Sequence, residues 1–266
     1  MNTLPTFIQK DDIRSLAPAA FAGDKAVGLS DRYTFISTER VIDALAEQGW
    51  FPVTAQQSKN RRIKDPGHFT HAVTFRQPHV ELAINGVCPE VVLLNDHRGR
   101  RPAELLAGFL RLICLNGLMV NTGIGETELV RVHKGDAELD VIATLLVAQQ
   151  TLKTAEDEIR DWQSIQVSLQ DQIGFARQAL ALRTEKAPVN IEALLERRRT
   201  EDASNDLWTV FNVVQEHLTQ GGGNRSLFGR RGVRRITGLN SGQKFNQGLW
   251  ALAQSAGERI KAAIGI

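Results

Sequence analysis

The chain has 266 residues, of which 42% are hydrophobic and 23% are charged, values that are ordinary for a globular protein. A chain of this length can bury a large core, either as one domain or as a domain with a sizeable appendage. The formal net charge is only +2, which excludes a protein whose overall field alone would attract nucleic acid. The distribution of charge along the chain must therefore indicate any anionic partner.

Cysteine usage and hydropathy predict a cytoplasmic protein. The chain has two cysteines, Cys88 and Cys114, and neither belongs to a Cys-x-x-Cys pair. Such sparse cysteine favours a reducing compartment over a disulfide framework. The first residues lack the charged-then-apolar plan of a signal peptide, and no run approaches the roughly 20 apolar residues that cross a bilayer. We expect no membrane partner.

The first part of the chain predicts a helix followed by a β-hairpin. Residues 1–32 have no sustained period and are expected to form a lead segment. A helix is predicted over residues 38–48, and Gly49 can end it in a left-handed conformation. Alternating apolar residues at 51–55 and at 73–75 then predict two half-buried strands.

The loop between these two strands is basic. It carries four cations against a single acid, Asp65, which opens an Asp-Pro-Gly turn signal. One interpretation is a solvated hairpin tip, and the other is a finger that contacts phosphate. The candidate phosphate contacts in this loop are Lys59, Arg61, Arg62 and Lys64.

Further strand-like patterns follow at residues 80–84, 91–94, 109–120 and 128–133. Residues 91–94 are apolar on both faces, which is typical of a strand that is covered on both sides. Residues 103–112 also fit a short helix, because their leucines have helical spacing as well. Periodicity alone does not separate a short apolar strand from a short helix.

After this region the pattern becomes helical. Residues 139–183 contain no proline and predict one very long helix or two in tandem. Another helix is predicted over residues 191–218, with an interruption near 202–205, and the arginines at 197–199 are interpreted as part of its solvated face. A closing helix is predicted over residues 244–263.

These patterns together predict an α+β fold, in which an antiparallel β-sheet with a short N-terminal helix is packed by long C-terminal helices. The expected division is a lead segment at 1–32, a helix and sheet core at 33–136, and a helical part at 137–266. The long helix has an apolar stripe wide enough to pack on a neighbouring subunit, which predicts a homo-oligomer.

The strongest functional signal is a glycine- and arginine-rich loop at 221–239. No acidic residue occurs from His217 to Gly257, so the cations there have no local partner. Arginines are preferred partners of phosphate oxygens, and a ring among them offers a stacking face for a base. The other interpretation is a disordered basic loop without a ligand. The candidate nucleic-acid contacts are Arg225, Phe228, Arg230, Arg231, Arg234, Arg235 and Lys244.

No motif in the chain indicates a particular reaction. The glycines at 221–223 are not followed by the Gly-Lys-Ser/Thr of a nucleotide-binding P-loop, and the six histidines include no His-Glu-x-x-His. Cys114 lies in an apolar run typical of an inert core cysteine. We therefore expect no catalytic residue, metal or cofactor, and a carboxylate nuclease built on Asp136, Glu138 and Asp140 is a weak alternative.

Several motifs resemble a phage/plasmid-like protein family of unknown function that is carried on mobile elements and prophages. They are Leu93-Leu94-Asn95-Asp96-His97, Phe109-Leu110-Arg111-Leu112-Ile113-Cys114-Leu115-Asn116-Gly117, Trp208-Thr209-Val210-Phe211-Asn212 and Asn246-Gln247-Gly248-Leu249-Trp250. The resemblance covers nearly the whole chain. It implies a mobile-element setting but supplies no activity.

A shorter stretch resembles the core of the recombination annealing proteins of eukaryotes and phages. It comprises Phe35-Ile36, Arg40-Val41-Ile42 and Gly49-Trp50, which precede the basic hairpin. That resemblance implies rings or filaments that hold single-stranded DNA in a basic groove. The extra strands predicted between Val80 and His133 depart from the simplest version of that core.

The leading hypothesis is therefore a mobile-element protein that binds or anneals single-stranded DNA in recombination or replication. The alternative is a protein-interaction factor, such as an antagonist of host defence, whose basic loop binds an acidic partner. A metal-dependent nuclease comes third.

Overall fold

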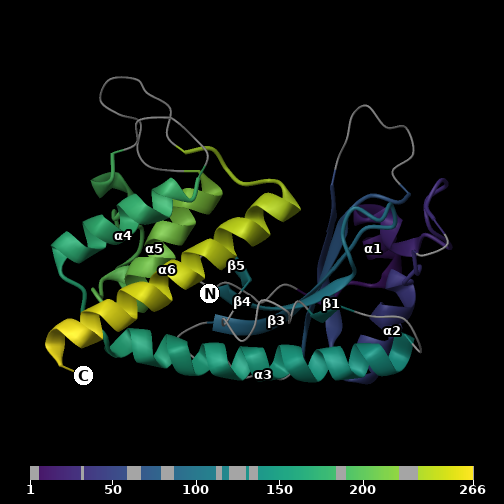
Figure 1. Ribbon diagram of the computed structural model, residues 1–266, viewed down its shortest axis with the longest axis horizontal. Helices are drawn as coiled ribbons and strands as arrows, with labels where there is room; N and C mark the ends of the chain where they lie inside the picture. Colours follow the sequence, from purple (N-terminus) through teal and green to yellow (C-terminus); the bar gives the residue numbers. More distant parts are fainter. Residues whose placement is uncertain are drawn as a thin grey trace. The chain divides into compact units, whose positions relative to one another are not determined.

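The computed structural model describes residues 6–30, 33–58, 67–78, 87–111, 116–119, 130–131, 137–183, 190–221 and 233–265. The chain divides into two compact units, Met1–Lys153 and Thr154–Ile266, here called the sheet unit and the helical unit (Figure 1). The strand predicted at 80–84, the hairpin tip and Cys114 lie outside the described residues.

The sheet unit is built on an antiparallel meander in which strands follow one another in chain order. Its strands are β1 (Phe51–Gln57), β2 (His71–Arg76), β3 (Val87–Asn95), β4 (Glu104–Arg111) and β5 (Asn116–Met119), and β6 (Val130–Arg131) pairs with β4. The alternative of a helix at 103–112 is wrong, because β4 pairs along its length with β3 and places Ala107 opposite Val91. An α+β fold is confirmed.

The short helix before the hairpin forms as its sequence predicts. This helix, α2 (Thr38–Glu47), begins where the Ser37 hydroxyl accepts a hydrogen bond from the Arg40 amide at 3.3 Å. It ends before Gly49, whose φ of +77° lies in the left-handed region that glycine adopts without strain. Val41 and Leu45 on its apolar face are buried in the core.

The lead segment is folded against the hairpin. It contains α1 (Lys10–Leu16) and a 3-10 turn at Pro18–Phe21. The Ile8 amide donates to the Pro52 carbonyl at 2.9 Å, and the Ala19 amide donates to the Gln57 side-chain oxygen at 2.8 Å. Both acceptors lie on β1, so this strand is bordered by the segment that precedes it in the chain.

The stretch at 139–183, for which the sequence predicts one very long helix or two in tandem, forms two helices. They are α3 (Ala137–Ser164), which carries the chain from the sheet unit into the helical unit, and α4 (Leu169–Ala181). The break is local, because the Ser168 side chain caps α4 by accepting from the Asp171 amide at 3.2 Å. Two further helices follow, α5 (Leu207–Gln220) and α6 (Leu239–Ile264).

The helix predicted over 191–218 is wrong in its first half. Residues 191–206 form only short 3-10 turns at Glu192–Leu194 and Thr200–Asp202. The α-helix starts after Asp206, whose carboxylate accepts hydrogen bonds from the amide and the hydroxyl of Thr209, each at 2.8 Å. From Leu207 to Leu218 every side chain of α5 is buried, so α5 is the central helix of this unit.

Aromatic rings form the core of the helical unit. Trp162, Trp208, Phe211 and Trp250 come from α3, α5 and α6, and their ring centroids lie 4.5–6.4 Å apart. The indole of Trp250 donates to the Glu158 carboxylate at 2.9 Å. Burial raises the pKa of Glu158, and hydrogen bonds from Gln254 and Trp250 oppose that rise in part.

Candidate anion-binding site

A pocket of about 360 Å³ lies in the helical unit where α6 begins. Three segments form it: the end of α4, the residues before α6, and the first turns of α6. Its described lining contains cations and hydroxyls but no acid: Leu182, Arg183, Arg235, Ile236, Thr237, Gly238, Ser241, Lys244 and Phe245. A concave surface with several convergent polar groups and an apolar base is typical of a ligand site.

The start of α6 faces this pocket without a side-chain cap. Gly238 is the N-cap residue and has no side chain, and no side-chain hydrogen bond caps the helix. The first amides of a helix lack partners within it and carry its partial positive charge. Ser241 adds a hydroxyl in the first turn, and Lys244 adds a cation one turn further on. This arrangement favours an anion over a neutral ligand.

Arg183 fixes the wall of the pocket. Its guanidinium donates to the Leu218 carbonyl at 2.8 Å and to the Arg234 carbonyl at 2.6 Å. The same group lies 5.9 Å from the centroid of the Phe245 ring. Arg183 therefore connects the end of α5, the segment before α6 and α6 itself, while its charge remains in the lining.

Gly221 allows that segment to pass close to the end of α5. Its φ is +81°, and a Cβ atom there would lie 3.0 Å from the amide nitrogen of Arg235. The Ile236 amide then donates to the Thr219 carbonyl at 2.9 Å. A substitution of Gly221 is consequently expected to strain the backbone and to move Arg235, a change that a crosspeak shift of residues 233–237 in an NMR spectrum would report.

The structure brings together some of the residues that the sequence predicts. Arg235 and Lys244 line the pocket, and Arg234 contributes its carbonyl to the bond with Arg183. Arg183, Thr237 and Ser241 were not predicted, since each is unremarkable in its local sequence. The other candidates lie outside the described residues: Lys59, Arg61, Arg62, Lys64, Arg225, Phe228, Arg230 and Arg231.

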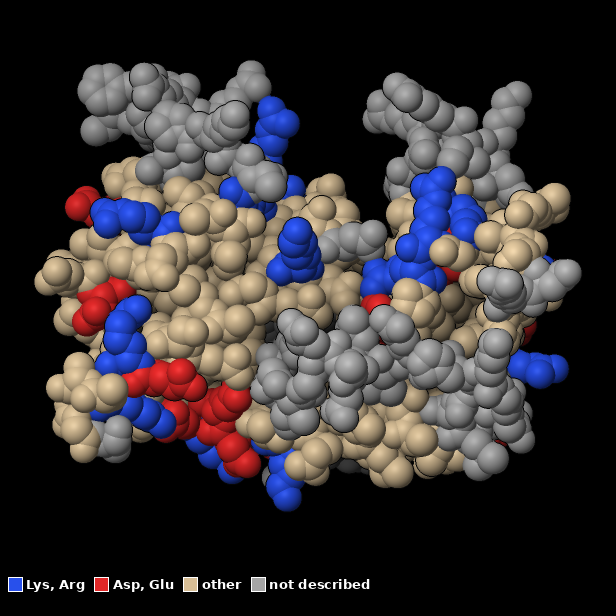
Figure 2. Space-filling model, in the orientation of Figure 1, with Lys and Arg blue, Asp and Glu red and all other residues tan. Residues whose placement is uncertain are grey.

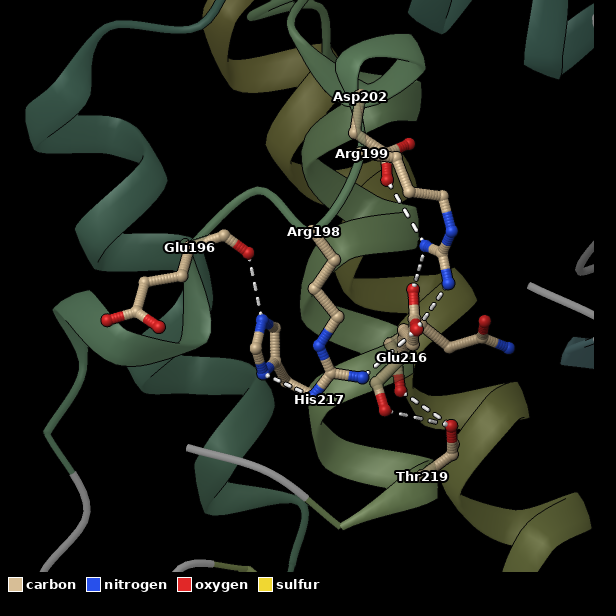
Figure 3. A network of polar contacts seen from close by, with 8 residues as sticks. Glu196, Arg198, Arg199, Asp202, Glu216, His217 and Thr219 are labelled. Atoms are coloured by element: carbon tan, nitrogen blue, oxygen red, sulfur yellow. Dashed lines mark hydrogen bonds and ion pairs between the residues drawn. The ribbon is translucent and has the colours of Figure 1, made fainter. Parts of the chain in front are cut away.

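The arginine triplet at 197–199 belongs to a different arrangement, and its interpretation as a solvated helical face is wrong. Arg198 and Arg199 both bind the carboxylate of Glu216, a buried residue of α5, at 2.6–3.0 Å (Figure 3). Burial opposes the ionisation of Glu216, but the hydrogen bonds from Arg199 and Arg198 outweigh it and hold its pKa below the ordinary value. These arginines hold the 3-10 turns on α5.

Charge is unevenly distributed over the helical unit. Basic side chains lie around the start of α6, whereas acidic side chains gather over the C-terminal parts of α3 and α6 (Figure 2). The acidic group includes Glu158 and Asp161, and Lys261 pairs with Asp161 at 2.5 Å. An anion approaching this unit is therefore attracted toward the start of α6.

The sheet unit contains a buried polar cluster around the β3–β4 turn. The Asp96 carboxylate accepts from Arg98 at 2.7 Å and from Thr70 at 2.5 Å. These bonds outweigh the effect of burial and hold the pKa of Asp96 below its ordinary value. Among the described residues, no group of three or more His, Cys, Asp or Glu side chains is placed to hold a metal ion.

Two buried histidines in this cluster differ in their hydrogen bonding. His71 makes a hydrogen bond at each nitrogen, donating to the Phe69 carbonyl and accepting from the Thr38 hydroxyl, both at 2.8 Å. Neither nitrogen of His97 has a hydrogen-bond partner of ordinary geometry, and the Ala19 backbone, which raises the pKa of His97 slightly against the effect of burial, makes only a weak polar contact with the ring. The ring of His97 lies 5.0 Å from that of His71. Burial lowers the pKa of His71 to about 4 and that of His97 to about 3.

The fold and the pocket define an α+β protein with a cationic site at the start of a helix. The chain matches the family described as "Domain of unknown function (DUF932)" over residues 28–250, and it belongs to that family. Two relatives from Escherichia coli (strain K12), the UPF0380 proteins YafZ and YfjQ, are each 33% identical to it over 254 residues. These alignments cover 93% of this chain and 91% of each relative.

No solved structure matches the chain. Among the described helices, none combines the length and the apolar character needed to cross a membrane.

Proposed function

We propose that this chain binds single-stranded nucleic acid through the pocket at the start of α6. The observation that carries the proposal is the convergence of Arg183, Arg235 and Lys244 on one pocket whose described lining has no acid. Phosphate oxygens are the anions that such a set of cations, hydroxyls and helix amides recognises. The apolar side chains of Leu182 and Ile236 in the lining give a base or sugar a surface to contact.

The proposal extends to annealing within a mobile element, in line with the sequence motifs. A protein that holds single strands by their phosphates leaves the bases free to pair with a second strand. Complementary labelled strands should therefore anneal faster in the presence of the protein than in its absence. An unchanged rate at saturating protein would reduce the function to binding alone.

Binding is expected to weaken steeply with salt, because each neutralised phosphate releases counterions from the strand. Changing Arg235 and Lys244 together to alanine removes two described cations of the pocket. The slope of log affinity against log salt should then become shallower by about 1.4, since each contact to a single strand contributes about 0.7. Fluorescence anisotropy of a labelled oligonucleotide measures both quantities.

Arg160→Ala is the matched control for this test. Arg160 lies on α3 in the same unit, is 60% exposed and pairs with the exposed Asp157. Its loss changes the net charge by one but leaves the pocket intact, so the slope should stay near that of the unchanged protein. If Arg160→Ala reduced the slope by half as much as the double variant, the effect per removed charge would be the same, and only the overall charge would matter.

Self-association is part of the proposal. The first half of α3 exposes Ile142, Leu146 and Val147, and the Leu146 side chain is 61% exposed. Apolar side chains at this spacing on one helix suit a second copy of the chain. Light scattering should show an oligomer that Leu146→Lys dissociates, whereas a clean monomer of the unchanged protein at micromolar concentration would contradict the expectation.

A further inference from the structure

We infer that the pocket at the start of α6 receives a phosphomonoester, from the phosphorylated end of a strand or from a free nucleotide. This inference rests on the proposed function and names the part of the ligand that enters the pocket. The alternative is a phosphodiester from the interior of a strand, which would lie across the pocket and continue on both sides.

Charge favours the monoester. A phosphodiester carries one negative charge, whereas a phosphomonoester carries about 1.5 to 2 at neutral pH and has three terminal oxygens. The pocket offers the cations of Arg235 and Lys244, the hydroxyls of Thr237 and Ser241, and the first amides of α6. This number of donors matches a group with three accepting oxygens better than one with two.

The volume of the pocket favours an end of a chain. Its volume of about 360 Å³ lies near the lower limit of ordinary ligand sites, which suits one terminal group and not several linked nucleotides. Leu182 and Ile236 give the lining an apolar surface, and Phe245, which also belongs to the lining, is buried. A sugar or base attached to the phosphate has this surface to contact.

Gly238 leaves room for the phosphate at the helix start. Its φ of −88° is open to any residue, and a Cβ atom there would make only ordinary contacts, the shortest 3.5 Å from the Ser241 hydroxyl oxygen. The backbone therefore does not require glycine. An aspartate at this position would cap α6 and place a carboxylate where we assign the phosphate.

The first experiment compares otherwise identical oligonucleotides with a 5′-phosphate, a 3′-phosphate or hydroxyls at both ends, together with a free nucleoside monophosphate. We expect at least one phosphorylated ligand to bind about tenfold more tightly than its unphosphorylated counterpart, the effect of one added charge-assisted hydrogen bond. Competition by inorganic phosphate at constant ionic strength distinguishes the contribution of the phosphate group to the affinity from that of the rest of the ligand.

The outcomes separate the inference from the proposed function. Equal, salt-sensitive binding of all three oligonucleotides would overturn the inference and leave strand binding intact. Binding of the monophosphate without binding of any strand would support the phosphate site and contradict strand binding. If no probe binds at low ionic strength, both are wrong.

The second experiment uses Gly238→Asp, with Gly238→Ala as its steric control. The aspartate is expected to keep or raise the melting temperature, because it caps α6, and to abolish the preference for the phosphorylated ligand. Gly238→Ala should retain most of that preference. A phosphate preference that survives in Gly238→Asp would overturn the assignment, and since this variant is expected to fold, the result does not depend on damage to the protein.

Discussion

Replacing Arg199 by alanine is expected to destabilise the helical unit by about 3 kcal/mol, because it leaves a buried carboxylate with only part of its compensating charge. The Glu216 side chain is 7% exposed, and its two oxygens accept from Arg199 at 2.6 and 2.8 Å. Arg198 alone remains after the substitution, at 3.0 Å from one oxygen. Burial then disfavours the charged form of Glu216 with less to oppose it.

Urea unfolding followed by tryptophan fluorescence measures this effect, since three of the four tryptophans, Trp162, Trp208 and Trp250, lie in the helical unit. The control is Arg160→Ala, whose ion pair with Asp157 is exposed on both sides and should change stability by less than about 0.5 kcal/mol. Adding Glu216→Gln to Arg199→Ala should restore part of the loss, because an amide is cheaper to bury than an unpaired carboxylate. A loss below about 1 kcal/mol for Arg199→Ala would mean that the network is solvated.

The same network predicts a pH dependence. The pKa of Glu216 is lower in the folded protein than its ordinary value of about 4.5. The ion pairs therefore stabilise the fold fully above that value, and their contribution is lost as pH falls through the folded pKa. Arg199→Ala removes much of this contribution, so the unfolding free energies of the variant and the unchanged protein should converge at acidic pH.

Local patterns predicted the elements whose partners lie nearby in the chain. The glycine at Gly49 and the alternation in β1 and β2 each act within a few residues, and the structure confirms the helix and both strands. The expectation that β2 is half-buried is wrong, because its side chains are buried on both faces of the sheet. The segment at 103–112 was ambiguous, because leucines at its spacing suit a helix or a covered strand equally. Pairing with β3 decides the matter, and this contact has no local signature.

The errors arise where distant contacts override local preference. Residues 191–206 have the composition of a helix, but they form only short 3-10 turns. Arg198 and Arg199 in this segment form ion pairs with Glu216, which lies on α5. The candidate site shows the same limit. The basic composition around 221–239 indicated Arg235 and Lys244, but Arg183 joins them only because its guanidinium reaches two carbonyls at the end of α5 and before α6.

Lowering the pH from 7 to 5 is expected to weaken the sheet unit by about 2 kcal/mol through His71 alone, because its pKa is about 4 when folded and about 6.5 when unfolded. The unfolded chain binds more protons between these two values, so stability falls as pH falls through this window. His97, with a folded pKa of about 3, acts in the same direction. Glu90 on β3 acts in the opposite direction, since burial raises its pKa.

Amide hydrogen exchange in β2 and β3, corrected for the intrinsic rate at each pH, reports this change within the sheet unit. Because these amides lie in the sheet unit, the measurement also excludes the contribution of His217, whose pKa is lowered by burial in the helical unit. Comparing the variants His71→Asn and His97→Phe with the unchanged protein at both pH values removes the contribution of Glu90. A loss of protection from pH 7 to pH 5 that is as large in both variants as in the unchanged protein would contradict the expectation.

Substitutions of the two histidines should differ in their effect on stability at pH 7. His71→Asn is expected to cost about 1–3 kcal/mol, because the Thr38 hydroxyl and the Phe69 carbonyl lose the ring that connects them. His97→Phe should cost nothing or stabilise, because both nitrogens of His97 are buried without ordinary hydrogen bonds and a phenyl ring has none to bury. Both variants should nevertheless weaken the pH dependence, since each removes a group that charges only when the unit unfolds. A stability loss in His97→Phe as large as in His71→Asn would show that His97 has a polar contact on which the fold depends.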